Sequence, residues 1–125
     1  MKVVKLLKND SNESLTRIDF KQLDRLVIKN REGCHVLKFS NILFLKSDSN
    51  YTEIYTNDDK QFIASKTLKS LQSKLGDFFI RVHQSYIVNI LFIEEYHYHN
   101  GIRLANNEII PVSNSMKKKV RSMFK

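Results

Sequence analysis

In the segment from Phe78 to Asn89, four side chains that could take part in binding or catalysis lie close together in the sequence. Between two apolar stretches the segment places a cation, an imidazole, an amide and a hydroxyl: Arg81, His83, Gln84 and Ser85. Arginine, glutamine and serine are common ligands of phosphate groups and base edges in nucleic acids. Two strands joined by an ordinary polar β-turn would have the same composition, so the segment alone leaves both interpretations open.

Catalysis is a second chemistry to consider, because His83 and Ser85 combine an imidazole with a hydroxyl. However, the strand–turn–helix elbow that activates a nucleophilic serine does not surround Ser85. The 3 glycines of the chain are scattered and cannot build a glycine-rich phosphate loop. We therefore expect no enzymatic activity.

Metal binding is a third chemistry, suggested by His97 and His99, which would lie on one face of a strand. Glu94 and Glu95 are near, but no cluster of acidic residues or cysteines with ligand spacing accompanies the pair. An exposed strand with two outward polar residues is the simpler interpretation. Cys34 is the single cysteine, which excludes a disulfide framework and a four-cysteine zinc site. We expect Cys34 to be a small, half-buried apolar residue, and we expect neither a metal nor a cofactor.

The charge of the chain favours a polyanionic partner, since 21 Lys and Arg against 13 Asp and Glu give a net charge of +8 at pH 7. Residues 112–125 contain no acid and these cations: Lys117, Lys118, Lys119, Arg121 and Lys125. This pattern is typical of a solvated helix face, a phosphate-facing helix or a membrane-surface helix. The apolar face formed by Met116, Val120 and Met123 is small and lacks Trp, which argues against a membrane partner.

The elements that must position these residues are mostly strands. From Arg25 onward, alternating apolar and polar residues flank turns at 30–33, 57–59 and 100–101, which predicts a mainly antiparallel β domain. Three leucines follow the spacing of one helix face: Leu68, Leu71 and Leu75. They predict one short mid-chain helix that ends at Gly76. A basic C-terminal helix, capped by Ser113 or Ser115, completes the expected fold.

With 125 residues, the chain is long enough for one domain. We assign residues 25–125 to that domain and the polar, less periodic residues 1–24 to an N-terminal extension or linker. No apolar run approaches the ~20 residues of a membrane span. Charges run through the apolar part of residues 1–8, which makes a poor signal peptide. We expect a cytoplasmic location.

Four separated motifs resemble those of the LytTR family, the DNA-binding output domain at the end of many bacterial response regulators. The most specific one runs from Phe79 to Asn89, where the family pattern is F-x-R-x-H-R-S-[YF]-x-V-N. The other matching segments lie in the same order as in the family: Leu43–Leu45 followed by Asn50-Tyr51-Thr52, Thr67–Leu71, and Ile110–Ser113. The resemblance covers about residues 25–125.

The resemblance implies an elongated stack of small antiparallel sheets that places loops in successive major grooves of DNA. Carried over by position, the family's DNA contacts fall in three segments: Asn50, Tyr51 and Thr52; Arg81, Gln84 and Ser85; Asn114, Lys117 and Lys118. We expect His83 and Asn89 to hold the backbone of the second loop. The family usually has Arg at the positions of Gln84 and Asn114. Because Arg prefers guanine whereas Gln and Asn suit adenine, the sequence preference should differ from that of Arg-bearing relatives.

The main hypothesis is therefore a sequence-specific regulator of transcription that binds double-stranded DNA, as the output domain of a two-component response regulator. The family implies direct repeats in a promoter, a homodimer on DNA, an upstream receiver domain and a histidine kinase. The chain would then be either a fragment of such a regulator or a stand-alone one. The alternative is a basic β module that binds RNA or an acidic protein. RNA-binding domains use exposed aromatic side chains for stacking, and the candidates here are Tyr51, Tyr55 and Tyr86.

Overall fold

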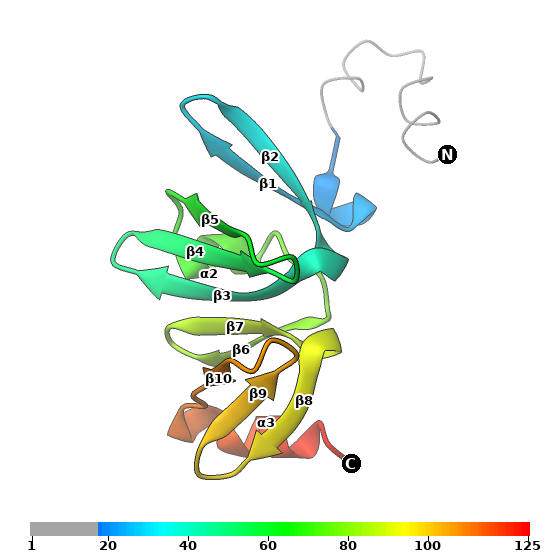
Figure 1. The fold of residues 1–125 in the computed structure, drawn as a ribbon, viewed down its shortest axis with the longest axis vertical. Coiled ribbons are helices and arrows are strands. Elements are labelled where there is room, and N and C mark those ends of the chain that lie inside the picture. Colours follow the sequence, from blue (N-terminus) through cyan, green and yellow to red (C-terminus); the bar gives the residue numbers. More distant parts are fainter. Residues whose placement is uncertain (1–17) are drawn as a thin grey trace.

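The computed structural model describes residues 18–125 (Figure 1), so most of the predicted extension, residues 1–24, lies outside the described part. Immediately before the first strand, Phe20–Leu23 forms a single 3₁₀ turn, η2, whose cap Asp19 accepts a hydrogen bond from the Lys21 amide (3.1 Å). The elements then follow in chain order: β1 (Arg25–Asn30), β2 (Gly33–Lys38), η3 (Phe39–Asn41), β3 (Ile42–Asp48), β4 (Tyr51–Thr56), β5 (Gln61–Ala64), α2 (Leu68–Gln72), β6 (Phe79–His83), β7 (Tyr86–Asn89), η4 (Ile90–Phe92), β8 (Ile93–His97), β9 (Gly101–Leu104), β10 (Ile109–Ile110), η5 (Asn114–Met116) and α3 (Lys117–Ser122).

The strands form three antiparallel sheets, which lie one above the other in Figure 1. The β1–β2 hairpin is at one end, a five-stranded sheet with the order β5-β4-β3-β7-β6 is in the middle, and the three-stranded sheet β10-β9-β8 is at the other end beside α3. The prediction of a mainly β, elongated stack of small antiparallel sheets, with a short mid-chain helix and a basic C-terminal helix, is confirmed.

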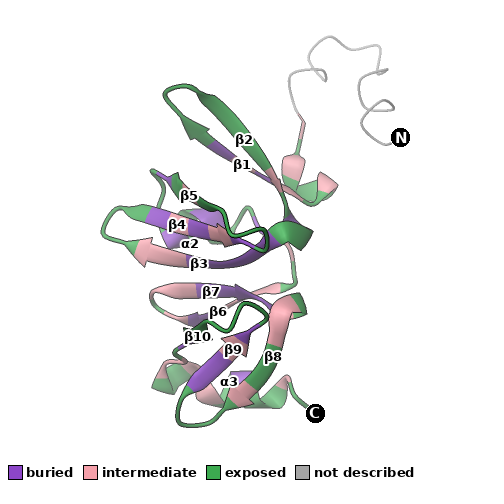
Figure 2. Ribbon diagram, in the orientation of Figure 1, coloured by how far each residue is buried: buried purple, intermediate pink, exposed green. Residues whose placement is uncertain are grey.

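Two hydrophobic cores lie on opposite faces of the central sheet, because successive side chains of a strand point to opposite faces. Leu45 packs with the hairpin and α2, whereas its neighbour Phe44 packs toward the three-stranded sheet and α3. Figure 2 shows buried residues along β3, β4, β7 and β9, with exposed residues at most turns. Since both faces of the central sheet are covered, the ends of its strands and its edge strands, β5 and β6, remain available to a partner.

The two helices differ in detail from the prediction. The mid-chain helix begins as expected after Thr67, whose hydroxyl accepts from the Ser70 amide (3.1 Å), but it ends at Gln72 rather than at Gly76. A Cβ atom on Gly76 would lie 3.2 Å from the Phe39 ring, so this glycine allows a close approach rather than a helix cap. Neither Ser113 nor Ser115 caps the last helix; their hydroxyls lie 3.2 Å apart and bond to each other.

The β1–β2 hairpin also corrects one expectation. Its turn forms as predicted, and the Asn30 side chain accepts from the amides of Glu32 (2.8 Å) and Gly33 (3.1 Å). Cys34, however, is exposed rather than half-buried. Only one face of the hairpin packs against the first core, so residues on its outer face stay in solvent, as the 49% exposure of Val36 illustrates.

Candidate nucleic-acid interface

The three predicted contact segments lie in a row along one edge of the stack. The Ser47 amide, next to the β3–β4 turn, donates to the Ser85 carbonyl of the β6–β7 turn (2.9 Å). The Ser113 amide, just before η5 and α3, donates to the Val82 carbonyl near the end of β6 (2.9 Å). Figure 1 shows both turns and the start of α3 at the left of the view. Segments that are far apart in the sequence are thus brought side by side by main-chain hydrogen bonds.

The first segment is a tight turn between β3 and β4, with Ser49 in the left-handed region (φ 55°). Asn50 is exposed at the turn, and Tyr51 is 52% exposed at the start of β4. Thr52 corrects the prediction of a three-residue contact loop. It lies inside β4, it is fully buried, and its hydroxyl donates to the Lys66 carbonyl (2.8 Å). Thr52 is therefore a structural residue, and Asn50 and Tyr51 are the available side chains.

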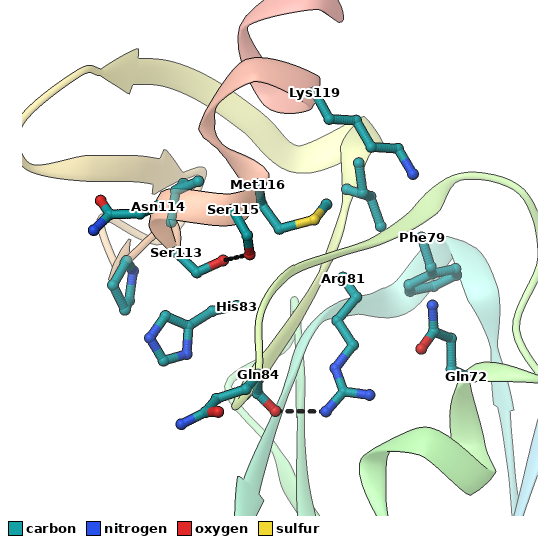
Figure 3. A pocket seen from close by; sticks show the side chains of 13 residues that line it. Gln72, Phe79, Arg81, His83, Gln84, Ser113, Asn114, Ser115, Met116 and Lys119 are labelled. Carbon is teal, nitrogen blue, oxygen red and sulfur yellow. Dashed lines mark hydrogen bonds between the residues drawn. The ribbon is translucent and has the colours of Figure 1, made fainter.

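The second segment is the β6–β7 turn, whose shape is held by two side chains, of which Figure 3 shows the bond of Arg81. The Arg81 guanidinium donates through Nη2 to the Gln84 carbonyl (2.6 Å), and His83 Nδ1 accepts from the Ser85 amide (3.1 Å). Arg81 is half-buried and retains further N–H groups, since a guanidinium carries five. The Gln84 side chain is exposed at the tip, and Ser85 is half-buried. The turn thus exposes one side-chain carboxamide, that of Gln84, on a backbone that these hydrogen bonds already hold in place.

Asn89 fixes the other end of β7. It is 1% exposed, and its amide nitrogen donates to the carbonyls of Phe39 (3.1 Å) and Ile42 (2.9 Å). Its side-chain oxygen accepts from the Leu91 amide (3.0 Å). His83 holds the backbone of the β6–β7 turn as expected. For Asn89 the expectation was wrong, because its bonds hold η3, the start of β3 and η4 rather than that turn.

The third segment is the start of the last helix. Asn114 and Lys118 are exposed and Lys117 is half-buried, while Val120, one turn after Lys117, is fully buried in the second core. The ion pairs among residues 18–125 join Lys60 to Asp58 and Arg103 to Glu94 and Glu95, so none involves α3. The cations of α3 therefore stay uncompensated by any salt bridge within the described residues.

An open depression of about 800 Å³ separates the second and third segments (Figure 3). Its lining includes Arg81 from β6, Gln84 from the β6–β7 turn, Asn114 and Lys119 from the last helical segment, and Gln72 from α2. Gln72 has no sequence signal that marks it as a site residue, because no local pattern shows that α2 ends beside β6. In the sequence, Lys119 was noted only as one of the cations of residues 112–125 and not as a site residue. The lining of the depression is mixed, with apolar side chains such as Phe79 and Met116 beside two cations, Arg81 and Lys119.

The other possibilities, a metal site and a membrane-spanning helix, have less support in the described residues. Between residues 18 and 125 there is no group of three or more His, Cys, Asp or Glu side chains placed to hold a metal ion. The rings of His97 and His99 are 6.2 Å apart, and His97 Nδ1 accepts from the His99 amide (3.4 Å). No helix within the described range has the length and apolar character needed to cross a membrane.

Two groups with shifted pKa values lie off this edge. Burial, together with a hydrogen bond to Glu53 (2.7 Å), raises the pKa of Tyr55 to about 12. A hydrogen bond from the Thr56 hydroxyl, assisted by Lys60, lowers the pKa of Asp58 from its usual 3.8. Asp58 lies in the β4–β5 turn, at the opposite end of β4 from Tyr51. Neither group belongs to the candidate interface.

Comparison with known proteins gives two findings. The sequence matches the family model of the LytTr DNA-binding domain over residues 32–125. Among solved structures, the chain is similar to the LytTr DNA-binding domain of a protein from Bacillus cereus that is described as a methyl-accepting/DNA response regulator. The TM-score is 0.69 at 24% sequence identity, and the match covers 81% of this chain and 96% of that chain, which establishes a shared fold. A search of the curated proteins found no match.

Proposed function

The chain belongs to the family of LytTr DNA-binding domains, and we propose that it binds double-stranded DNA in a sequence-specific manner and regulates transcription. The observation that carries the proposal is the row of three segments along one edge. It combines exposed amide side chains, which suit base edges, with cations that no acid of residues 18–125 neutralises. The family match by itself supports a more general statement: the chain is a domain from a DNA-binding family that is not an enzyme family.

The roles follow from the side chains that each segment offers. Asn50, Gln84 and Asn114 contact base edges, because a carboxamide can donate to one base atom and accept from the next. Lys117 and Lys118 bind phosphates and supply affinity that does not depend on sequence. Arg81 contributes in two ways, since it holds the β6–β7 turn and has N–H groups left for a phosphate. Tyr51 and Ser85 complete the contact set.

A duplex partner is favoured over RNA by the packing of the three candidate tyrosines, Tyr51, Tyr55 and Tyr86. The Tyr55 ring stacks on Phe44, with ring centroids 4.5 Å apart, and Tyr86 packs against the same core. A base needs a free aromatic face for stacking, and of the candidates only Tyr51 is exposed. This packing supports groove contacts rather than base stacking.

The family suggests the biological setting. We propose that residues 25–125 form the output domain of a two-component response regulator in the cytoplasm, without a cofactor and without enzymatic activity, and that residues 1–24 form an extension or linker. An upstream receiver domain and a histidine kinase would supply the signal. On promoter DNA, a homodimer would occupy direct repeats whose equivalent points lie about 10 or 21 bp apart, because both copies must bind the same side of the helix.

Selection of bound sites from a pool of random duplexes tests this proposal. The expected result is an enriched motif, repeated at the spacing above, with adenine at positions contacted by Gln84 and Asn114. Gel shifts with the selected duplex, its single strands and an RNA of the same sequence then separate the alternatives. Recovery of random sequences would refute sequence-specific binding. A preference for RNA or single strands would favour the alternative nucleic-acid module, and no nucleic-acid binding would favour an acidic protein partner.

A further inference from the structure

The connection between β5 and α2, residues 65–67, lies beside the first contact segment. In the register of the β4–β5 pair, Thr52 is opposite Ala64. The buried Thr52 hydroxyl donates to the Lys66 carbonyl (2.8 Å), which ties the connection to the base of the β3–β4 turn. Figure 1 shows the end of β5 on the same side of the stack as the β3–β4 and β6–β7 turns. The position of residue 66 is thus fixed relative to Asn50 and Tyr51.

Lys66 offers a cation at this position. The residue is exposed, and its side chain has no ion pair or hydrogen bond with any other residue between 18 and 125. Residues 60–76 contain four lysines and no acid, so this stretch is a second acid-free basic segment besides residues 112–125. An exposed cation next to a groove-contacting turn has the natural role of binding the adjacent phosphate.

We propose that Lys66 binds a backbone phosphate of the duplex next to the bases reached by Asn50 and Tyr51. The β5–α2 connection is then a fourth DNA-contact segment. This inference rests on the proposed function and extends the row at the edge of the stack beyond the β3–β4 turn. The contact contributes affinity for every sequence and carries no base preference, since a lysine–phosphate pair is independent of the base.

The test compares Lys66→Gln with Lys60→Gln in the full chain. Both substitutions remove one positive charge, but Lys60 lies at the opposite end of the same strand pair and is 3.7 Å from the Asp58 carboxylate. Binding to a mixed-sequence duplex of roughly two helical turns is measured by fluorescence anisotropy across a range of salt. Lys66→Gln should leave the unfolding curve unchanged, because Thr52 bonds to the main chain of residue 66 and not to its side chain. Lys60→Gln should change it little, because the ion pair that it removes is exposed.

For Lys66→Gln, the slope of log K against log salt should decrease in magnitude by about 0.9, the value for one lost phosphate contact. Between 50 and 200 mM salt, the advantage of the wild type over this variant should therefore shrink by about 3.5-fold. Lys60→Gln should keep the wild-type slope. A slope for Lys66→Gln equal to that of the wild type, or equal changes in both variants, would overturn the inference.

Lys117→Gln, measured in parallel, separates failure of this inference from failure of the proposed function. If Lys117→Gln lowers the slope while Lys66→Gln does not, the domain binds DNA without the fourth contact. If the wild type itself shows no salt-dependent binding to duplex DNA, the proposed function and this inference both fall.

Discussion

Replacing Asn89 with alanine should lower the free energy of unfolding by about 3 kcal/mol. The side chain makes three hydrogen bonds, two to the carbonyls of Phe39 and Ile42 and one to the Leu91 amide. Each contributes about 1 kcal/mol net, and its loss leaves a main-chain group without that partner. Because Asn89 is 1% exposed, water cannot easily replace these bonds. For a domain of this size, the melting temperature should fall by roughly 12 °C or more.

Urea unfolding followed by circular dichroism measures this effect, with Asn57→Ala, at an exposed position in the β4–β5 turn, as the matched control. Asn89→Asp should be at least as destabilising at neutral pH, because it keeps the acceptor for Leu91 but directs carboxylate oxygens at two carbonyl oxygens. A loss below about 1 kcal/mol for Asn89→Ala would mean that the three bonds do not hold η3, β3 and β7 together as described.

Three further outcomes are expected. Replacing both Lys117 and Lys118 with Gln should weaken binding to all duplexes alike and reduce the slope of log K against log salt by about 1.8, as titrations at several salt concentrations would report. Gln84→Arg should leave the fold intact and move the preferred base from adenine toward guanine by about 1–3 kcal/mol in bound-site selection; identical motifs for both proteins would exclude a base contact by Gln84. Asp58→Asn should lose less stability than the wild type on acidification, because folding lowers the pKa of Asp58. In the wild type, the Asp58 carboxylate contributes its full stability above the usual pKa of 3.8, and this contribution disappears as the pH falls through the lower folded-state pKa. Parallel acid-unfolding curves would contradict this.

Local patterns predicted the strands, because alternation and turn residues are local signals. The hairpin turn at Asn30–Gly33 formed as expected, with the Asn30 side chain bonded to the turn amides. Alternation does not say which strands pair, however. The stacking of small sheets followed from the family resemblance, whereas the order β5-β4-β3-β7-β6 was not predicted and is known from the structure.

The burial of Thr52 could have been predicted from the sequence. Thr52 and Ile54 are two residues apart, so they share a strand face, and Ile54 belongs to the first core. The contact role of Thr52 came from the family resemblance, which carried the loop over by position without regard to this alternation. By contrast, the bond from Arg81 to the Gln84 carbonyl and the approach of Gln72 to the depression depend on tertiary geometry. No local pattern contains that information.

The exposure of Cys34 has a similar cause. Small apolar residues are usually buried, but burial requires a second layer. The β1–β2 hairpin has a packing partner on one face only, and Cys34 lies on the other side. The sequence carries no sign of which face of a two-stranded sheet remains uncovered.

The most direct test of the central claim is to record which backbone amides of the ¹⁵N-labelled chain respond when the selected duplex is added. The largest changes should fall at one edge of the stack: Asn50, Tyr51, Gln84, Ser85, Asn114, Lys117 and Lys118. Residues 57–60, at the other end of β4 and β5, should remain unchanged. The largest changes at residues 57–60, or changes spread evenly over both edges, would contradict the assignment of this edge as the DNA-binding surface.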